Sequence, residues 1–293
     1  MKRILIPLDG SKFSEAALTH IEMLVKQSDA EIILLRVVPF LWPSGFVQAR
    51  EMGDKLDKEA SNYLCSINSK LTVKGMEGEV FVREGNIADV ICDFAKENRI
   101  DLIAMTTHGR GGVRRWALGS VAEKIVRSSP VPILLYRIKG DRIEDSNYTK
   151  ILIPIDGSKF SENIFPQTNK FVEIFNSKIL FLHVMDTRLT ENFAVAKDIF
   201  VHEEKTARQD IKSYFTSLEN KVKESKITYE LLIEKGDPAE VICDLAEKNE
   251  VDLIAMSTHG RSGISRWTVG SVADRVLRVS SKPLLLTRAK EQE

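Results

Sequence analysis

The segment that decides the fold is GNIADVICDFAKENRIDLIAMTTHGRGGVRRWALGSVAEKIV, residues 85–126, because the chain nearly repeats it as GDPAEVICDLAEKNEVDLIAMSTHGRSGISRWTVGSVADRVL, residues 236–277. Each copy predicts a helix, a buried strand, a loop punctuated by glycine, and a second helix that opens on Gly-Ser. Such a helix points its N-terminus into a crevice, where backbone N–H groups favour a phosphate. The pattern therefore predicts a duplicated α/β module that binds a phosphate or a nucleotide.

The duplication covers the whole module. The opening ILIPLDGSKFSE, residues 4–15, returns as ILIPIDGSKFSE, residues 151–162. The next apolar run, EIILLRVVP, residues 31–39, returns as KILFLHVMD, residues 178–186. Short apolar runs that alternate with helical segments predict βαβ units, and hence a parallel sheet with helices on both faces. We therefore expect an α/β protein made of two Rossmann-like domains.

A chain of 293 residues is long enough for two domains of ordinary size. The polar stretch KGDRIEDSNYTK, residues 139–150, carries no apolar period and is the natural linker. We expect a first domain over residues 1–138, a linker over 139–149 and a second domain over 150–293.

The composition excludes several classes of protein. Lys plus Arg and Asp plus Glu each number 42, so no overall field attracts nucleic acid or an anionic membrane. No apolar run approaches the roughly 18 residues of a membrane span, and the first run stops at Asp9. Three cysteines, an odd number, do not suggest a disulfide framework. We expect a protein of the reduced cytoplasm, with neither membrane nor nucleic acid among its partners.

The predicted site lies where the strands end. In a parallel sheet the loops that follow the strands meet at one edge, so we expect Asp9 to lie near the loop that begins at His108. Asp156 and His259 hold the same places in the second copy. A carboxylate at this edge can bond the hydroxyl groups of a ribose.

Glycines and a helix start supply the predicted phosphate site. Gly109 and Gly119 recur as Gly260 and Gly270 at the same spacing. Glycine lets the backbone approach a ligand without a Cβ atom, and the Ser120 hydroxyl adds a donor at the helix start. The alternative is that these glycines only close turns and that Ser120 only caps its helix.

The aspartates and histidines also have structural alternatives. Asp9 and Asp156 could bond the backbone of the turn that follows them, as Asx-turns. His108 and His259 have no Cys or second His at metal-ligand spacing, so a loop hydrogen bond is favoured over a metal site. We therefore predict no metal site.

Familiar catalytic motifs are absent from the sequence. The chain has no GxxxxGK[ST] of P-loop enzymes, no G-x-S-x-G of hydrolases and no Cys-x-x-Cys. No general acid–base pair stands out either. We expect a binding protein and no catalytic residues.

The chain resembles the universal stress protein family over both halves. The resemblance rests on ILIPLDGS and ILIPIDGS, on LLRV and LFLHV, and above all on THGRGGVRRWALGSVAEKIV and THGRSGISRWTVGSVADRVL. ATP-binding members carry Gly-x2-Gly-x9-Gly-Ser/Thr. Here the second and third glycines match, while Thr106 and Ser257 stand in place of the first. The resemblance implies a five-stranded parallel sheet of order 3-2-1-4-5 in each domain, an internal pseudo-dimer, and a homodimer as a further option.

The resemblance also implies roles for individual residues. Asp9 and Asp156 would contact the ribose, and the backbone of Val37 and Val184 would contact the adenine. The candidate site of the first half comprises Pro7, Asp9, Val37, Thr106, His108, Gly109, Arg110, Gly112, Gly119, Ser120 and Val121. The candidate site of the second half comprises Pro154, Asp156, Val184, Ser257, His259, Gly260, Arg261, Gly263, Gly270, Ser271 and Val272.

The implied function is that of a cytoplasmic stress-response or regulatory protein that binds ATP, with Mg²⁺ or Mn²⁺ as an optional companion ion, and hydrolyses it slowly at most. Two alternatives remain. Thr106 and Ser257 favour a nucleotide-free scaffold that binds a protein partner. An ATP-using enzyme related to the adenylating ATP pyrophosphatases would need an SGGxDS-type loop after the first strand, which DGSKFSE does not supply.

Overall fold

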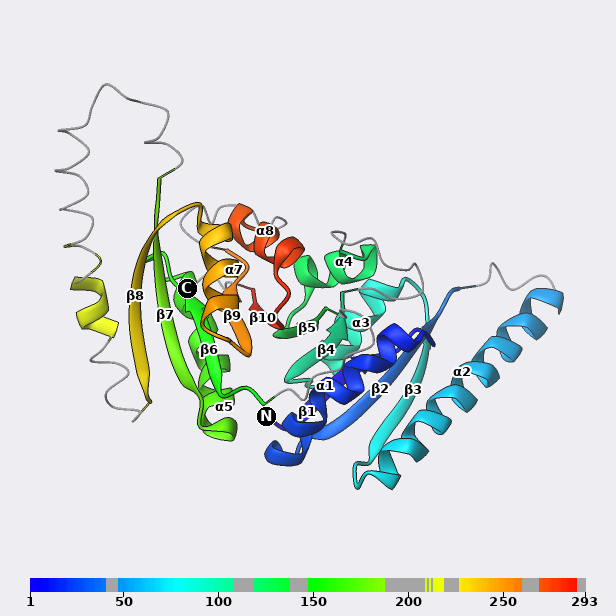
Figure 1. Ribbon diagram of the computed structural model, residues 1–293. Helices are drawn as coiled ribbons and strands as arrows, with labels where there is room; N and C mark the ends of the chain where they lie inside the picture. The colour runs from blue at the N-terminus through cyan, green and yellow to red at the C-terminus, as the bar shows by residue number, and fades with distance from the viewer. Residues whose placement is uncertain are drawn as a thin grey trace. The chain divides into compact units, whose positions relative to one another are not determined.

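The structure of the protein is a computed structural model (Figure 1). It describes residues 1–40, 47–107, 118–137, 147–187, 209, 211, 213–218, 227–259 and 269–288. The chain divides into two compact units, which comprise residues 1–147 with 283–288, and residues 148–282. The domain boundaries expected from the sequence, at residues 138 and 150, stay a prediction.

The first unit alternates strands and helices as the sequence predicts. Its elements are β1 (Arg3–Pro7), α1 (Lys12–Ser28), β2 (Glu31–Val38), α2 (Val47–Val73), β3 (Gly78–Glu84), α3 (Ile87–Glu97), β4 (Leu102–Thr106), α4 (Ser120–Ser128) and β5 (Ile133–Tyr136). The five strands pair in parallel in the order β3-β2-β1-β4-β5, which confirms the expected order. A further strand, β10 (Leu284–Thr287), pairs antiparallel with β5.

The second unit repeats the alternation. Its described elements are β6 (Lys150–Pro154), η1 (Ser161–Ile164), α5 (Phe165–Phe175), β7 (Lys178–Asp186), β8 (Tyr229–Gly236), α7 (Pro238–Lys248), β9 (Leu253–Ser257) and α8 (Ser271–Val279), with residues 213–218 also helical. Strands β8, β7, β6 and β9 pair in parallel in that order. The fifth strand of this repeat is β10, which groups with the first unit.

Helices cover both faces of each sheet. In the first unit, α1 packs on β1 and β4, α2 packs on β2 and β3, and α3 packs against α4. Right-handed crossovers place α1 and α2 on one face and α3 and α4 on the other, since the chain reverses its direction across the sheet after β3. In the second unit α7 and α8 pack together in the same way (Figure 1). The carboxyl ends of the parallel strands therefore meet at one edge of each sheet.

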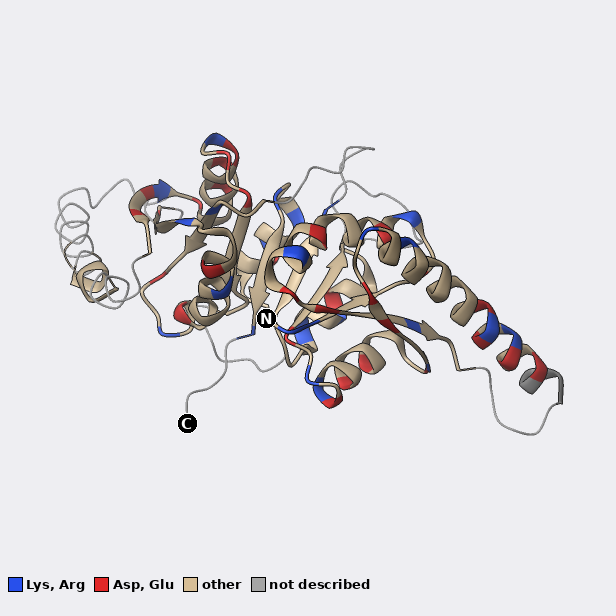
Figure 2. Cartoon of the chain, turned by 90° about the horizontal axis from the view of Figure 1, so that it is seen from below, with Lys and Arg blue, Asp and Glu red and all other residues tan. Residues whose placement is uncertain are grey.

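The central strands form the core because they are buried on both faces. Residues 4–6 of β1, 102–104 of β4, 151–153 of β6 and 253–255 of β9 have no exposed side-chain surface. Such strands read as continuous apolar runs, which is why the sequence predicted them as parallel. In contrast, the outer helices carry both basic and acidic residues (Figure 2). None of the helices in the described ranges is both long enough and apolar enough to cross a membrane.

The helix after the first strand begins differently in the two units. Ser11 caps α1, since its Oγ accepts a hydrogen bond from the backbone N–H of Ser14 at 3.1 Å. Ser158 Oγ accepts from Ser161 N at 3.2 Å in the same way, but the helix then starts as the 3₁₀ turn η1. Pro166 explains the difference, because its ring nitrogen cannot donate to the carbonyl four residues earlier.

Candidate functional site

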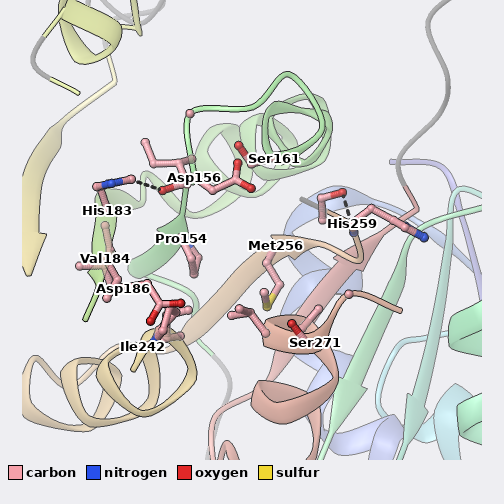
Figure 3. Close-up of a pocket in the computed structure, with 18 of the residues that line it drawn as sticks. Pro154, Asp156, Ser161, His183, Val184, Asp186, Ile242, Met256, His259 and Ser271 are labelled. Atoms are coloured by element: carbon pink, nitrogen blue, oxygen red, sulfur yellow. Dashed lines mark hydrogen bonds between the residues drawn. The ribbon is translucent and has the colours of Figure 1, made fainter. Parts of the chain in front are cut away.

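Each unit has a cavity at the edge of the sheet where the parallel strands end. The cavity of the first unit has a volume of about 850 Å³ and that of the second about 700 Å³. The ends of β1, β2 and β4 line the first, together with the start of α4. The ends of β6, β7 and β9 line the second, together with the start of α8 (Figure 3). Both volumes lie in the range of small-molecule sites.

Every described candidate residue lines one of these cavities. The first cavity is lined by Pro7, Asp9, Val37, Thr106, Gly119, Ser120 and Val121. The second cavity is lined by Pro154, Asp156, Val184, Ser257, His259, Gly270, Ser271 and Val272. The other candidates, His108, Gly109, Arg110, Gly112, Gly260, Arg261 and Gly263, lie outside the described residues.

The aspartate after the first strand of each unit accepts hydrogen bonds from its own turn. Asp9 Oδ1 accepts from Ser11 N at 2.9 Å and from Ser11 Oγ at 2.5 Å. Asp156 Oδ1 accepts from Ser158 N at 2.9 Å and from Ser158 Oγ at 2.6 Å. Asx-turns therefore form, and both aspartates also line their cavities. The two interpretations are compatible, since the turn fixes the orientation of a carboxylate that lines the cavity.

Backbone hydrogen bonds fix the helix starts. Gly119 N donates to Thr107 O at 2.9 Å, and Gly270 N donates to Thr258 O at 2.7 Å. These bonds hold the N-terminus of α4 or α8 against the end of the preceding strand. Helix geometry leaves the first N–H groups of such a helix without intrahelical partners, so they can receive an anion. Ser120 and its counterpart open these helices at the cavities.

The glycine before α8 also has a structural role. Its φ of −60° is one that any residue adopts, so Gly270 is not required for backbone conformation. A Cβ at this position would lie 3.2 Å from the carbonyl oxygen of Thr258, which is closer than ordinary contact. The close approach of helix start and strand end therefore favours glycine even without a ligand. Packing at the helix start is thus one reason for glycine at this position.

Thr106 and Ser257 leave room for a ligand. Both are buried, with exposed fractions of 5% and 6%, and both line their cavities. The cavities of about 850 Å³ and 700 Å³ are the space that remains with the Thr106 and Ser257 side chains present, so their hydroxyl groups do not fill the site. Ser257 Oγ accepts from His259 N at 3.5 Å, and the His259 ring bonds the Thr258 hydroxyl at 3.0 Å. His259 is thus a hydrogen-bonding residue at the strand end, as the sequence favoured.

In each site a tyrosine that the sequence did not reveal lines the cavity and donates a hydrogen bond to a glutamate. Tyr63 of α2 donates to Glu15 Oε1 of α1 at 3.0 Å, and Tyr214 donates to Glu162 Oε1 at 3.0 Å. Both tyrosines line their cavities. Burial, and then the neighbouring glutamate carboxylate, raises the pKa of each tyrosine well above its usual range. Each phenol therefore stays protonated. The hydrogen bond of Tyr63 joins α2 to α1, and that of Tyr214 joins the helical residues 213–218 to η1.

Self-comparison of the chain could have found this pair. Tyr63 begins YLCSI, and Tyr214 begins YFTSL at the same place in the second copy. Glu15 and Glu162 already stood in the repeated SKFSE. The signal was weak because α2 is otherwise polar and divergent, so nothing in that helix marked the tyrosine as a site residue.

One position of the second strand holds an arginine in the first site and a histidine in the second. Arg36 of β2 donates from Nη1 to Leu8 O at 3.5 Å, and its guanidinium lies 5.5 Å from the centre of the Tyr63 ring. In the second unit His183 of β7 takes this place, and its Nδ1 lies 2.9 Å from Ile155 O (Figure 3). Because a carbonyl only accepts, Nδ1 of His183 carries a proton.

Comparison with known proteins gives the family. The model of the universal stress protein family matches residues 1–137 and again residues 147–288. The chain belongs to the universal stress protein family. Because the family model matches twice along the chain, the protein is a tandem member, with one family module in each half.

Relatives match one module or both. A universal stress protein of Methanocaldococcus jannaschii is 32% identical over 139 residues, which cover 46% of this chain and 82% of the relative. One of Mycolicibacterium smegmatis is 22% identical over 98% of this chain and 97% of its own length. A solved universal stress protein of Archaeoglobus fulgidus has a TM-score of 0.75 at 21% identity and covers 98% of each chain. This likeness confirms the fold of a tandem universal stress protein.

The described part of this universal stress protein shows no metal centre. Within those ranges no three or more His, Cys, Asp and Glu side chains gather as ligands for an ion. The described residues of the two sites supply oriented carboxylates, helix N-termini, strand-end backbone and apolar walls such as Ile91 and Ile242.

Proposed function

We propose that each unit binds ATP or a closely related adenine nucleotide, and that the protein is a cytoplasmic regulator of the stress response. The observation that carries the proposal is the duplicated cavity, which joins an oriented aspartate, a strand-end backbone and a helix N-terminus. Family membership supports the stress-response part.

Each part of the site suits one part of the nucleotide. The helix start at Ser120 or Ser271 would hold phosphate oxygens through backbone N–H groups and a hydroxyl. The Asp9 carboxylate, or its counterpart, would bond the ribose hydroxyls. The backbone at Val37 or its counterpart would bond the adenine edge, since the end of a parallel strand has backbone groups outside the sheet. Mg²⁺ or Mn²⁺ would accompany the phosphates when present.

Little or no ATP hydrolysis is expected. Fast phosphoryl transfer needs a base or a residue that positions water, together with neutralisation of charge. The raised pKa of Tyr63 and Tyr214 keeps their hydroxyl groups protonated, so neither phenol serves as a base near neutral pH. Turnover of about 1 s⁻¹ or more with Mg²⁺ would contradict this part of the proposal.

The nucleotide-free scaffold remains a second candidate because of Thr106 and Ser257, which replace a glycine. The cavities of about 850 Å³ and 700 Å³ argue for a bound ligand in the presence of these side chains. Protein binding without nucleotide would require that neither cavity retains an adenine ligand.

Titration of labelled ATP into the full chain tests the proposal. Ser120 and Ser271 are exposed first residues of their helices, so Ser120→Trp and Ser271→Trp place an indole at the cavity with little effect on the core. We expect about two ATP molecules per chain in the parent, about one in each variant and none in the double variant. Circular dichroism confirms folding. A folded double variant that binds like the parent would contradict the proposed site.

A second pair of variants tests the aspartate. Asp9→Asn keeps an oxygen for the turn but removes the carboxylate charge, whereas Ser11→Ala removes the Ser11 hydroxyl bond and keeps the carboxylate. If Asp9 bonds the ribose, Asp9→Asn weakens binding by about 1–3 kcal/mol, and Ser11→Ala weakens it less. Equal losses would show that Asp9 acts only through its turn.

A further inference from the structure

Among the residues that the structure describes, the two cavities differ in fixed charge at one strand position, while the carboxylates of Asp9 and Glu15 recur as those of Asp156 and Glu162. In the first unit Arg36 stands among acidic groups, because Tyr63, over which it lies, also feels the charges of Glu15 and Asp9. Arginine keeps its positive charge at every physiological pH. The first site therefore has a permanent cation beside its carboxylates, which include those of Asp9 and of Glu59, another lining residue of the cavity.

The second unit keeps the carboxylates and loses that cation. Tyr214 feels the charges of Glu162 and Asp156, which are the counterparts of the first pair. At the counterpart of Arg36 stands His183, which is 7% exposed and is neutral unless both ring nitrogens carry protons. Its Nδ1 bonds the carbonyl that follows β6, as Arg36 bonds the carbonyl that follows β1.

A second difference between the repeats adds a negative charge to the second cavity. Pro39 follows β2 in the first unit, and Asp186 holds the same place at the end of β7 in the second. Both residues line their cavities. Asp186 is exposed and adds a carboxylate beside the wall that Ile242 contributes (Figure 3). The backbone between these positions, at Val37 or Val184, is the part proposed to bind adenine. The difference in charge therefore lies within the binding cavity.

We propose that the two sites prefer adenine ligands of different charge. The first site, with Arg36, favours the triphosphate, and the second, with His183 and Asp186, favours a ligand with fewer negative charges, such as the nucleoside or its monophosphate. The inference rests on the proposed function of both cavities. Arg36 and His183 act as specificity-determining residues.

The size of the effect follows from Coulomb attraction. One permanent charge about 10 Å from the several negative charges of a triphosphate changes affinity in water by roughly tenfold at low salt. Adenosine carries no charge, so its affinity should not respond to Arg36. The ratio of ATP to adenosine affinity at each site is therefore the quantity that the proposal predicts.

Single-site proteins make that ratio measurable. Ser271→Trp leaves the first site open and Ser120→Trp leaves the second open, and calorimetry at low salt and pH about 8 gives the affinity of ATP and of adenosine for each. We expect the ATP-to-adenosine ratio to be about tenfold higher at the first site than at the second. Arg127→His, at a half-buried position of α4 that pairs with Glu123 and does not line the cavity, is the matched control and should change neither affinity.

The exchange of the two residues completes the test. Arg36→His in the first-site protein should lower ATP affinity about tenfold and leave adenosine unchanged, and His183→Arg in the second-site protein should raise ATP affinity by a similar factor. Equal ratios at the two sites, or an equal loss of both ligands with Arg36→His, would overturn the inference while the nucleotide function stands. If neither site binds any adenine ligand, the proposed function fails as well. Should a blocking variant not fold, the two exchange variants in the unblocked chain give the same comparison.

Discussion

The two units build matching cavities on differently packed supports. Behind the first cavity α1 runs unbroken, and Leu24 is fully buried. At the place of Leu24 the second unit has Phe171, whose ring lies 5.3 Å from that of Tyr148, and Tyr148 also lies 5.2 Å from Phe175. The strand ends and the starts of α4 and α8 are kept, whereas the buried side chain of the first helix changes from Leu24 to Phe171. Packing accepts many solutions of suitable volume, but a ligand site needs particular groups in particular places.

The start of the helix gives the largest expected contrast between the units. Thr19 lies inside α1 at the place where the second unit has Pro166. Thr19→Pro removes a helical N–H and clashes with the carbonyl of Glu15, so it should lower the free energy of unfolding of the first unit by about 3 kcal/mol. Hydrogen exchange of β1 and β2 measures the loss.

Pro166→Thr is the matched change in the second unit. Its helix already starts as a 3₁₀ turn, so the free energy of unfolding should change by less than about 1 kcal/mol. If Thr19→Pro has an equally small effect, the first unit can adopt the start of the second, and the contrast between the two supports disappears.

The cap of the third helix in each repeat gives the next contrast. Asp237 accepts hydrogen bonds from Ala239 N at 3.0 Å and from Glu240 N at 3.2 Å, and it forms an ion pair with Arg275. Its counterpart Asn86 makes no side-chain cap bond. Asp237→Ala should therefore lower the free energy of unfolding of the second unit by about 1–2 kcal/mol.

Asn86→Ala should lower the free energy of unfolding of the first unit by only a few tenths of a kcal/mol (about 0.3). Urea titrations followed by hydrogen exchange in α7 and α3 separate the two values. Equal losses in the two units would show that the cap bonds and the ion pair at Asp237 contribute little.

The helix-start glycine gives a smaller effect that is independent of ligand. Gly270→Ala, measured without nucleotide, should lower the free energy of unfolding by about 1 kcal/mol, because its Cβ would press on Thr258 O at 3.2 Å. Gly53→Ala within α2 has no heavy atom within 4 Å and should instead raise it by up to about 1 kcal/mol. A neutral Gly270→Ala would leave nucleotide binding as the only reason for this glycine.

The smallest contrast concerns acid. Glu22 of α1 pairs with Lys26 at 2.8 Å and with Lys74 at 2.6 Å, and these hydrogen bonds lower its pKa below the ordinary 4.5. The second unit has Asn169 at this place. Because the folded-state pKa is the lower one, the stabilisation is complete above pH 4.5 and is lost as the pH falls through the folded-state value.

The lysines are about half exposed, at 46% and 49%, so Glu22→Gln should lower the free energy of unfolding at pH 7 by less than about 1 kcal/mol. The difference between variant and parent should vanish in strong acid. Unfolding midpoints of variant and parent between about pH 2 and pH 7 measure this difference, because that range extends from well above to well below the ordinary pKa of glutamate. A difference that persists in strong acid would assign the effect to packing.

Much of the site was predictable because its parts are local. Asp9 with Gly10 and Ser11, and Gly119 with Ser120, are short segments whose turn and helix-start chemistry is written in consecutive residues. The parallel direction of the strands then follows from apolar runs that alternate with helices. The carboxyl ends of such strands necessarily meet at one edge. The duplication made each of these signals visible twice.

The sequence by itself determined the duplicated α/β modules and the residues that end the strands of the first sheet, and its resemblance to the universal stress protein family implied the order of those strands. Only the tertiary structure decided what faces those residues from distant segments. The Tyr63–Glu15 bond joins residues 48 positions apart, and the contact of Arg36 with Leu8 O spans 28 positions. Such contacts depend on how helices and strands pack, which no local pattern encodes, because propensity and periodicity report only on neighbours within a few residues.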